Sequence, residues 1–109
     1  MTRVLFVCVE NAGRSQLAQA LYELRGGEAR SAGAEPAEEL HEAVAEALEE
    51  IGVDIAGRRP RKLRPEDLEW ADLVVDVDEW GLAEPAGLCL EEVRELRADI
   101  ARRVAGLPC

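Results

Sequence analysis

The chain has 109 residues, 48% hydrophobic and 33% charged, so one folded domain over residues 1–109 is expected rather than a disordered chain. Its formal net charge of −10 argues against nucleic acids and anionic membrane surfaces as partners. No apolar run reaches membrane-spanning length, and a predicted strand at the N-terminus leaves no room for a signal peptide, so a cytoplasmic location is predicted.

The first predicted elements are a strand and a helix joined by a short loop. Residues 4–7 form a continuous apolar run, typical of a strand that is covered on both faces of a parallel sheet. A helix is predicted from Ser15 to Leu24, ending before two glycines, with an apolar face formed by Leu17, Leu21 and Leu24. In the connection between strand and helix, five residues separate Cys8 from Arg14.

This strand–loop–helix context favours an oxyanion site. A loop that closes onto a helix N-terminus directs backbone N–H groups into one concavity, and the helix dipole adds positive potential there. Arg14 is expected to clamp two oxygens of a tetrahedral anion, and Cys8 to attack its central atom as a thiolate at neutral pH. The alternative interpretation makes Cys8 an inert buried thiol and Arg14 a solvated residue at the start of a helix.

The other loop residues receive supporting roles. Ser15 is expected to donate a hydrogen bond to the sulfur, Asn11 to hold the loop by side-chain bonds to backbone, and Gly13 to adopt a positive φ. The predicted oxyanion-binding residues are Val9, Glu10, Asn11, Ala12, Gly13, Arg14 and Ser15.

A second strand is predicted at residues 29–32, followed by a second helix that Pro36 opens and Gly52 ends. The buried face of this helix is predicted to consist of Leu40, Val44, Ala47, Leu48 and Ile51. His41, the only histidine, lies off that face. It is interpreted as an exposed structural residue rather than a catalytic one.

Residues 58–64 contain five of the 13 positive charges. They form either a solvated loop that balances an acidic chain or a rim that attracts an anion or an acidic partner. A helical turn anchored by Trp70 is predicted at residues 65–70, and a third strand at residues 71–77. A long closing helix is predicted from the helical spacing of Leu90, Val93, Leu96, Ile100, Val104 and Leu107.

The alternation of strands and helices predicts an α/β fold, a small doubly wound parallel sheet of three to four strands with helices on both faces. In such folds the ligand site lies at the carboxyl ends of the strands, which is where Cys8 is placed.

Residues 4–16, with Cys8, Asn11, Arg14 and Ser15, resemble the phosphate loop of the low molecular weight protein tyrosine phosphatase superfamily. The sequence of this loop, Phe-Val-Cys-Val-Glu-Asn-Ala-Gly-Arg-Ser-Gln, is most similar to the arsenate reductase branch of the superfamily. The resemblance implies a cysteine-dependent enzyme that takes arsenate or a phosphate-type oxyanion. It also extends to residues 31–36, which resemble the segment after the family's second strand.

The sequence departs from the family after the third strand, where the polar segment that precedes a fourth strand is missing. Neighbouring parallel strands need a crossover of roughly a dozen residues, which residues 77–80 are too few to supply. The fourth strand is therefore predicted to be lost or reduced. The sheet then has three strands, or a partner chain completes its edge and an oligomer forms through that edge.

Residues 79–87 resemble the family segment that carries the general acid, and they place Glu84 where the family has an aspartate. Glu84 is interpreted as the acid, with Asp76 and Asp78 as alternatives. An ordinary loop carboxylate is the remaining interpretation of Glu84. Trp80 is the only aromatic candidate near the mouth of the site, since Tyr22 falls in the first helix.

The three cysteines, Cys8, Cys89 and Cys109, form neither a zinc signature nor a secreted disulfide framework, and no metal or cofactor is expected. Thioredoxin-coupled arsenate reductases carry their resolving cysteines in the missing segment, and Cys89 and Cys109 do not match those positions. The resemblance therefore implies an external reductant, a small thiol such as glutathione or mycothiol, or a redoxin. Approach of Cys89 to Cys8 is the alternative.

Three functions remain open. The first is arsenate reduction through Cys8 with an external thiol. The second is hydrolysis of phosphate monoesters through a cysteinyl-phosphate. The third is a catalytically impaired relative that binds oxyanions or a partner protein.

Overall fold

The computed structural model describes residues 2–55, 57–85 and 87–108. In chain order its elements are β1 (Arg3–Cys8), α1 (Arg14–Leu24), β2 (Glu28–Gly33), α2 (Glu42–Glu49), α3 (Pro65–Trp70), β3 (Leu73–Asp76), the 3₁₀ helix η1 (Val77–Trp80) and α4 (Leu90–Ala105). None of the described helices combines the length and the apolar character needed to cross a membrane.

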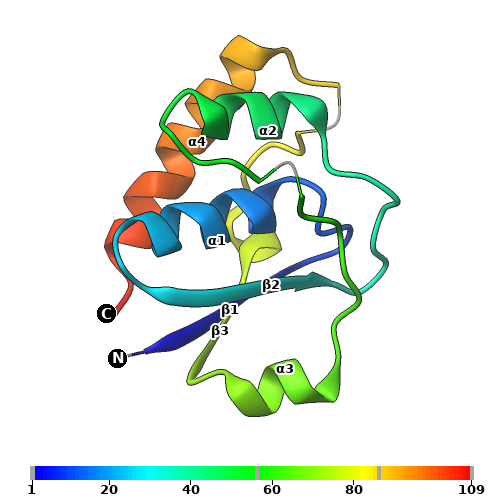
Figure 1. Ribbon diagram of the computed structural model, residues 1–109, viewed down its shortest axis with the longest axis vertical. Coiled ribbons are helices and arrows are strands. Elements are labelled where there is room, and N and C mark those ends of the chain that lie inside the picture. The colour runs from blue at the N-terminus through cyan, green and yellow to red at the C-terminus, as the bar shows by residue number, and fades with distance from the viewer. Residues whose placement is uncertain (1, 56, 86, 109) are drawn as a thin grey trace.

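The sheet has three parallel strands in the order β2-β1-β3, which confirms the predicted α/β class. Helices α1, α2 and α4 lie on one side of the sheet and α3 lies on the other (Figure 1). The described chain passes from β3 directly into η1, so the loss of the fourth strand is confirmed. The outer edge of β3 has no neighbouring strand among the described residues, and pairing with a partner chain there stays a prediction.

The main core lies between the sheet and α1, α2 and α4. Side chains of a strand alternate between its faces, and Val4, Phe6 and Cys8 of β1 all join this core. Leu5 is fully buried and points to the opposite face, where α3 lies (Figure 1). Because β1 is buried on both faces, its sequence is continuously apolar. This burial fixes the end of β1, where Cys8 lies.

The second helix starts later than predicted, because Pro36 does not open it and α2 begins only at Glu42. Residues 34–41 instead run beside the loop that follows β1. Their backbone N–H groups donate to carbonyl oxygens of that loop: Ala34 to Cys8 at 3.2 Å, Glu35 to Val9 at 2.8 Å, Ala37 to Glu10 at 3.0 Å and His41 to Ala12 at 3.0 Å. Long-range hydrogen bonds therefore replace the helical bonds that the sequence predicts.

Two aliphatic residues of the predicted apolar helix faces are exposed. Leu24 is the last residue of α1 and is 57% exposed, while Ile51 follows the end of α2 and is 36% exposed. The third strand is also shorter than predicted, because Val77 leaves the sheet and begins η1. In each case the helix or strand stops earlier than the apolar pattern does.

The basic cluster at residues 58–64 is tied to its surroundings. The Arg58 guanidinium pairs with Glu23 at 2.6 Å, Arg61 pairs with Asp67 at 2.6 Å, and Lys62 donates to the Ala34 carbonyl at 2.6 Å. These contacts favour a structural interpretation of the cluster over an anion-attracting rim. Trp70 anchors α3 as predicted, with the Arg30 guanidinium 4.3 Å from the centre of its ring.

Asp67 is the buried centre of these contacts. It accepts hydrogen bonds from the Arg61 and Arg30 side chains and from the Arg64 backbone N–H. Burial by itself raises the pKa of Asp67, but the hydrogen bonds from Arg61 and Arg64 outweigh it and hold the pKa below its usual value. The carboxylate is therefore charged, and it links α3 to β2 and to the basic cluster.

Candidate active site

The loop between β1 and α1 turns its N–H groups inward. The carbonyl oxygens of Cys8, Val9, Glu10 and Ala12 accept hydrogen bonds from residues 34–41 outside the loop. In a planar trans peptide the N–H of the next residue points the opposite way. The N–H groups of residues 9, 10, 11 and 13 therefore face the interior of the loop, which forms the concave arrangement expected for an oxyanion.

The conformations of two loop residues differ from prediction. Gly13 has φ −146°, so the positive φ predicted for it is wrong, and Asn11 takes the left-handed conformation with φ 52°. Asparagine tolerates this region because its short polar side chain bonds locally. Gly13 is required by packing instead, since a Cβ there would lie 2.3 Å from Pro85 Cγ and 3.1 Å from His41 Cδ2.

Two donors are directed at the Cys8 sulfur. The Asn11 backbone N–H lies 3.1 Å from Sγ, and the Ser15 hydroxyl lies 2.9 Å from it. Asn11 Oδ1 accepts the Arg61 backbone N–H, which fixes the orientation of the amide and makes Nδ2 the donor to Ser15 Oγ at 2.7 Å. The hydroxyl proton of Ser15 is then left for the sulfur.

Arg14 is held by two carboxylates of a distant segment. Its Nη2 lies 2.6 Å from Asp78 Oδ1 and 2.8 Å from Glu84 Oε2, and Nη1 donates to the Leu82 carbonyl at 3.2 Å. The Arg14 side chain is 11% exposed and that of Glu84 is 51% exposed. An entering oxyanion therefore competes with Glu84 for the guanidinium.

The structure brings two of the three candidate acids to Arg14 and leaves the third apart. Asp78 and Glu84 both contact its guanidinium. Asp76 instead accepts the Asp78 backbone N–H at 3.0 Å and caps η1. The geometry thus favours Asp78 and Glu84 over Asp76 as groups that reach a bound anion.

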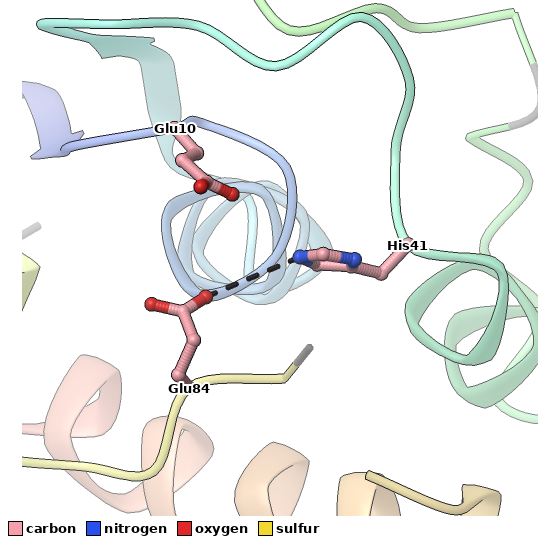
Figure 2. Close-up of side chains that lie close together, drawn as sticks. All are labelled: Glu10, His41 and Glu84. Atoms are coloured by element: carbon pink, nitrogen blue, oxygen red, sulfur yellow. Dashed lines mark ion pairs between the residues drawn. The ribbon is translucent and has the colours of Figure 1, made fainter. Parts of the chain in front are cut away.

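His41 immediately precedes α2 and lies beside the loop, with its Nε2 4.0 Å from Glu84 Oε1, a contact that the sequence did not predict. Its side chain is 25% exposed, so it is less exposed than predicted, and its interpretation as a structural rather than a catalytic residue stays a prediction. Figure 2 shows Glu10, His41 and Glu84 pointing toward one another in front of a helix seen end-on. No local spacing in the sequence signals this cluster, because its members come from three separate segments.

Trp80, the aromatic candidate for the mouth of the site, is engaged in packing. It lies edge-on against Phe6, with ring centres 6.5 Å apart, and the Arg103 guanidinium lies 5.7 Å from the centre of the Trp80 ring. Tyr22 packs against the same phenylalanine at 5.9 Å. Trp70 is stacked with Arg30 and Arg3 beside α3. All four aromatic residues of the chain are thus engaged in packing contacts.

Two of the three cysteines lie within the described part of the chain, and both are free thiols. Cys8 is buried at the floor of the loop. Cys89 is exposed and precedes α4, where its backbone N–H donates to Glu92 at 3.2 Å. Cys109, the other cysteine considered as a resolving thiol, lies outside the described residues.

Comparison with known proteins identifies related proteins. A protein named "Putative arsenate reductase" from Halobacterium salinarum is 39% identical over 129 residues, covering 97% of this chain and 90% of that protein. "Glutaredoxin arsenate reductase" from Synechocystis is 27% identical over 127 residues, covering 98% and 96%. The solved structure of YwlE arginine phosphatase from Geobacillus stearothermophilus is similar with a TM-score of 0.83 and 27% identity, covering 96% of this chain and 89% of that one.

Residues 3–104 match the family described as low molecular weight phosphotyrosine protein phosphatase. The match includes the whole cysteine–arginine loop, the α/β fold around it and the segment that carries Glu84. The resemblance inferred from the loop sequence is therefore confirmed, and the chain belongs to the low molecular weight phosphotyrosine protein phosphatase family.

Proposed function

We propose that this protein is an arsenate reductase that uses Cys8 as nucleophile and an external thiol as reductant. The observation that carries the proposal is the Cys8 sulfur at the floor of an amide-lined loop, contacted by the Asn11 N–H at 3.1 Å and by the Ser15 hydroxyl at 2.9 Å. The similarity to a protein named "Putative arsenate reductase" supports arsenate as the oxyanion.

In the proposed reaction the Cys8 thiolate attacks the arsenic atom and forms an S–As bond, while one arsenate oxygen leaves as water after protonation. Arg14 and the inward N–H groups stabilise the negative charge that develops on the remaining oxygens. An external thiol then attacks the Cys8 sulfur. The electron pair of the S–As bond stays with arsenic, so arsenic(V) leaves as arsenite and Cys8 is left in a mixed disulfide. A second thiol releases Cys8, and two thiols become one disulfide for each arsenate reduced.

Glu84 is the proposed proton donor to the leaving oxygen. Its carboxylate contacts Arg14 at 2.8 Å, and its side chain is half exposed, so it can exchange protons with water and still reach an anion on the loop. Asp78 also contacts Arg14, at 2.6 Å, but its side chain is less exposed. We therefore assign Asp78 to positioning the guanidinium.

We propose an external reductant because Cys89 is an exposed thiol just before α4, whereas Cys8 is buried at the floor of the loop. The similarity to a protein named "Glutaredoxin arsenate reductase" supports a glutaredoxin or a glutathione-type thiol as the reductant.

Phosphate monoester hydrolysis is the second candidate, supported by the family match and by the structural similarity to phosphatases. A phosphotyrosine ring needs an apolar or aromatic surface beside the nucleophile. The four aromatic side chains of this chain are all engaged in packing contacts, with Trp80 against Phe6. This observation supports arsenate reduction over hydrolysis of aryl phosphates.

The test compares two reactions in the same preparations. Arsenate-dependent oxidation of glutathione, with and without glutaredoxin, and hydrolysis of p-nitrophenyl phosphate are measured for the parent protein, Cys8→Ser and the matched control Cys89→Ser. We expect thiol-dependent arsenate consumption that Cys8→Ser abolishes and Cys89→Ser retains.

Hydrolysis without arsenate consumption would replace the reductase proposal by the phosphatase one. Phosphate binding without either activity would identify a catalytically impaired, oxyanion-binding relative. Loss of arsenate reduction in Cys89→Ser would make Cys89 the resolving thiol and overturn the external reductant.

A further inference from the structure

We infer that Glu10, His41 and Glu84 form a binding site for one divalent transition-metal ion at the mouth of the loop. Each residue offers one ligand atom, and these atoms all lie within 4.8 Å of one another (Figure 2). Zinc and similar ions bind imidazole nitrogen and carboxylate oxygen at about 2.0–2.2 Å. Glu10 and Glu84 are exposed, so rotation of their side chains would bring the carboxylate oxygens toward an ion bound at His41.

The imidazole supplies an independent observation. His41 Nε2 is shielded from solvent and has no hydrogen-bond partner among residues 2–55, 57–85 and 87–108. Leaving a buried nitrogen without a hydrogen-bond partner costs free energy. Glu84 Oε1 lies 4.0 Å from this nitrogen, which is too far for a hydrogen bond. A metal ion between them would satisfy both atoms.

The position of His41 is fixed by its surroundings. Its backbone N–H donates to the Ala12 carbonyl at 3.0 Å, and its carbonyl accepts the Val44 N–H of α2 at 3.0 Å. Its ring Cδ2 lies against Gly13, where a Cβ would come within 3.1 Å. The ligand nitrogen is therefore preorganised, and the two glutamates are the parts that move.

The local charge fits a divalent cation. Glu10, Asp78 and Glu84 carry three negative charges at the mouth, and Arg14 carries one positive charge. The resulting balance of −2 opposes the binding of an anion in the loop. An ion bound by Glu10 and Glu84 would neutralise these carboxylates and draw Glu84 away from Arg14, so Glu84 would act as the proposed proton donor only in the metal-free protein.

The ligand set also indicates the kind of metal. Two carboxylates alone would suit magnesium or calcium, whereas an imidazole ligand favours ions such as zinc, cobalt or nickel. Because zinc also binds thiolates strongly, Co²⁺ is the better probe: its absorption spectrum distinguishes nitrogen and oxygen ligands from sulfur.

The experiment is a titration of the reduced protein with Co²⁺, followed by absorbance and by calorimetry. We expect one ion per chain with visible ligand-field bands and no sulfur-to-cobalt charge-transfer band. His41→Gln and Glu10→Gln should each weaken binding about tenfold or more. Glu35→Gln is the matched control, since Glu35 is an exposed acid on the neighbouring segment, and it should leave the affinity unchanged.

Three results would overturn the site. These are absence of Co²⁺ binding, equal affinity in His41→Gln and the parent, and a charge-transfer band that disappears in Cys8→Ser or Cys89→Ser. Circular dichroism of each variant separates lost binding from lost folding. Because the readout is metal binding, its result is independent of whether the protein reduces arsenate.

Discussion

At the scale of single residues, the orientation of the Asn11 side-chain amide sets which hydrogen bond the Cys8 sulfur accepts from Ser15. Asn11 adopts a left-handed conformation, and its Oδ1 accepts the backbone N–H of Arg61, which lies 50 residues further along the chain. Nδ2 is thereby directed to Ser15, whose hydroxyl is directed to Cys8. A chain of hydrogen bonds thus runs from a long-range backbone contact to the proposed nucleophile.

Ser15→Ala removes the last donor of this chain. A hydrogen bond to a charged group contributes about 1.5–3 kcal/mol, so the rate of Cys8 alkylation by iodoacetamide at neutral pH should fall about tenfold or more. Mass spectrometry of the alkylated protein measures this rate. Ser31→Ala is the control, because the Ser31 hydroxyl is also buried but donates to Gln19. Equal alkylation of both variants would contradict the role of Ser15.

At the scale of elements, the site is a meeting point of three segments. The loop after β1 supplies Cys8, residues 34–41 hold its carbonyl groups, and the segment after η1 supplies Glu84. Gly13 is the point where the loop and that last segment touch, because it faces Pro85. The contact sets the distance between nucleophile and proposed acid.

Gly13→Ala should separate these two segments. The added Cβ would lie 2.3 Å from Pro85 Cγ, so the segment carrying Glu84 must shift. Overpacking of this kind costs about 1–3 kcal/mol, and we expect arsenate turnover to fall at least about tenfold. Gly57→Ala is the control, since a Cβ there meets no atom within 4 Å. Steady-state kinetics measure the effect, and equal turnover in both variants would exclude the proposed contact.

Asp67→Asn tests the link between α3 and the basic cluster. The carboxylate is buried and bonded to Arg61, Arg64 and Arg30, and Arg61 also supplies the N–H that orients Asn11. Asp67→Asn removes the charge that accepts these hydrogen bonds. The Arg30 and Arg61 side chains are about 40% exposed, so water can hydrate them instead. We therefore expect the free energy of unfolding to fall by about 1.5–3 kcal/mol.

Urea denaturation measures this loss. Glu66→Gln, an exposed carboxylate in the first turn of the same helix, is the control and should change stability little. Equal midpoints for Asp67→Asn and the parent would show that Asp67 contributes nothing to holding α3.

At the scale of the whole molecule, the excess of acidic residues disfavours anion binding but also supplies ion pairs that stabilise the fold. The net charge of −10 repels anions at long range, so binding of an oxyanion depends on the local amides and Arg14. Acidic side chains also connect helices. Glu50, just after α2, pairs with Arg94 and Arg97 of α4. Hydrogen bonding to Arg94 is the main cause that lowers the pKa of Glu50 from 4.5 to about 2.

This lowered pKa predicts how stability depends on pH. The folded state favours the charged form, so the contribution of Glu50 is complete above its unfolded pKa of 4.5 and is lost as the pH falls through about 2. The difference in urea midpoint between the parent and Glu50→Gln should therefore shrink on acidification over that range. Glu49→Gln, which changes an exposed neighbour, is the control. A difference that stays constant with pH would contradict the assignment.

The open edge of the sheet predicts the oligomeric state. β3 is only four residues long. The exposed carboxylate of Asp72 precedes it and that of Asp76 ends it, features that disfavour pairing with another strand. We expect sedimentation to give the monomer mass of 11.9 kDa. A dimer that Val74→Lys dissociates would instead support assembly through this edge, because Val74 is 46% exposed there.

The sequence by itself determined the central unit of this protein. The apolar run 4–7, the cysteine–arginine spacing and the helix after it predicted β1, the loop and α1, because each is encoded by neighbouring residues. The short connection after the third strand likewise predicted a sheet of three strands, since chain length limits what can cross.

Tertiary structure decided everything that depends on distant segments meeting. Residues 34–41 are not helical because their N–H groups satisfy loop carbonyls, and Arg14 pairs with Asp78 and Glu84 from 64 and 70 residues away. The cluster of Glu10, His41 and Glu84 arises in the same way. Sequence periodicity reports local geometry, whereas these contacts depend on how three irregular segments pack around one loop, and no period encodes that packing.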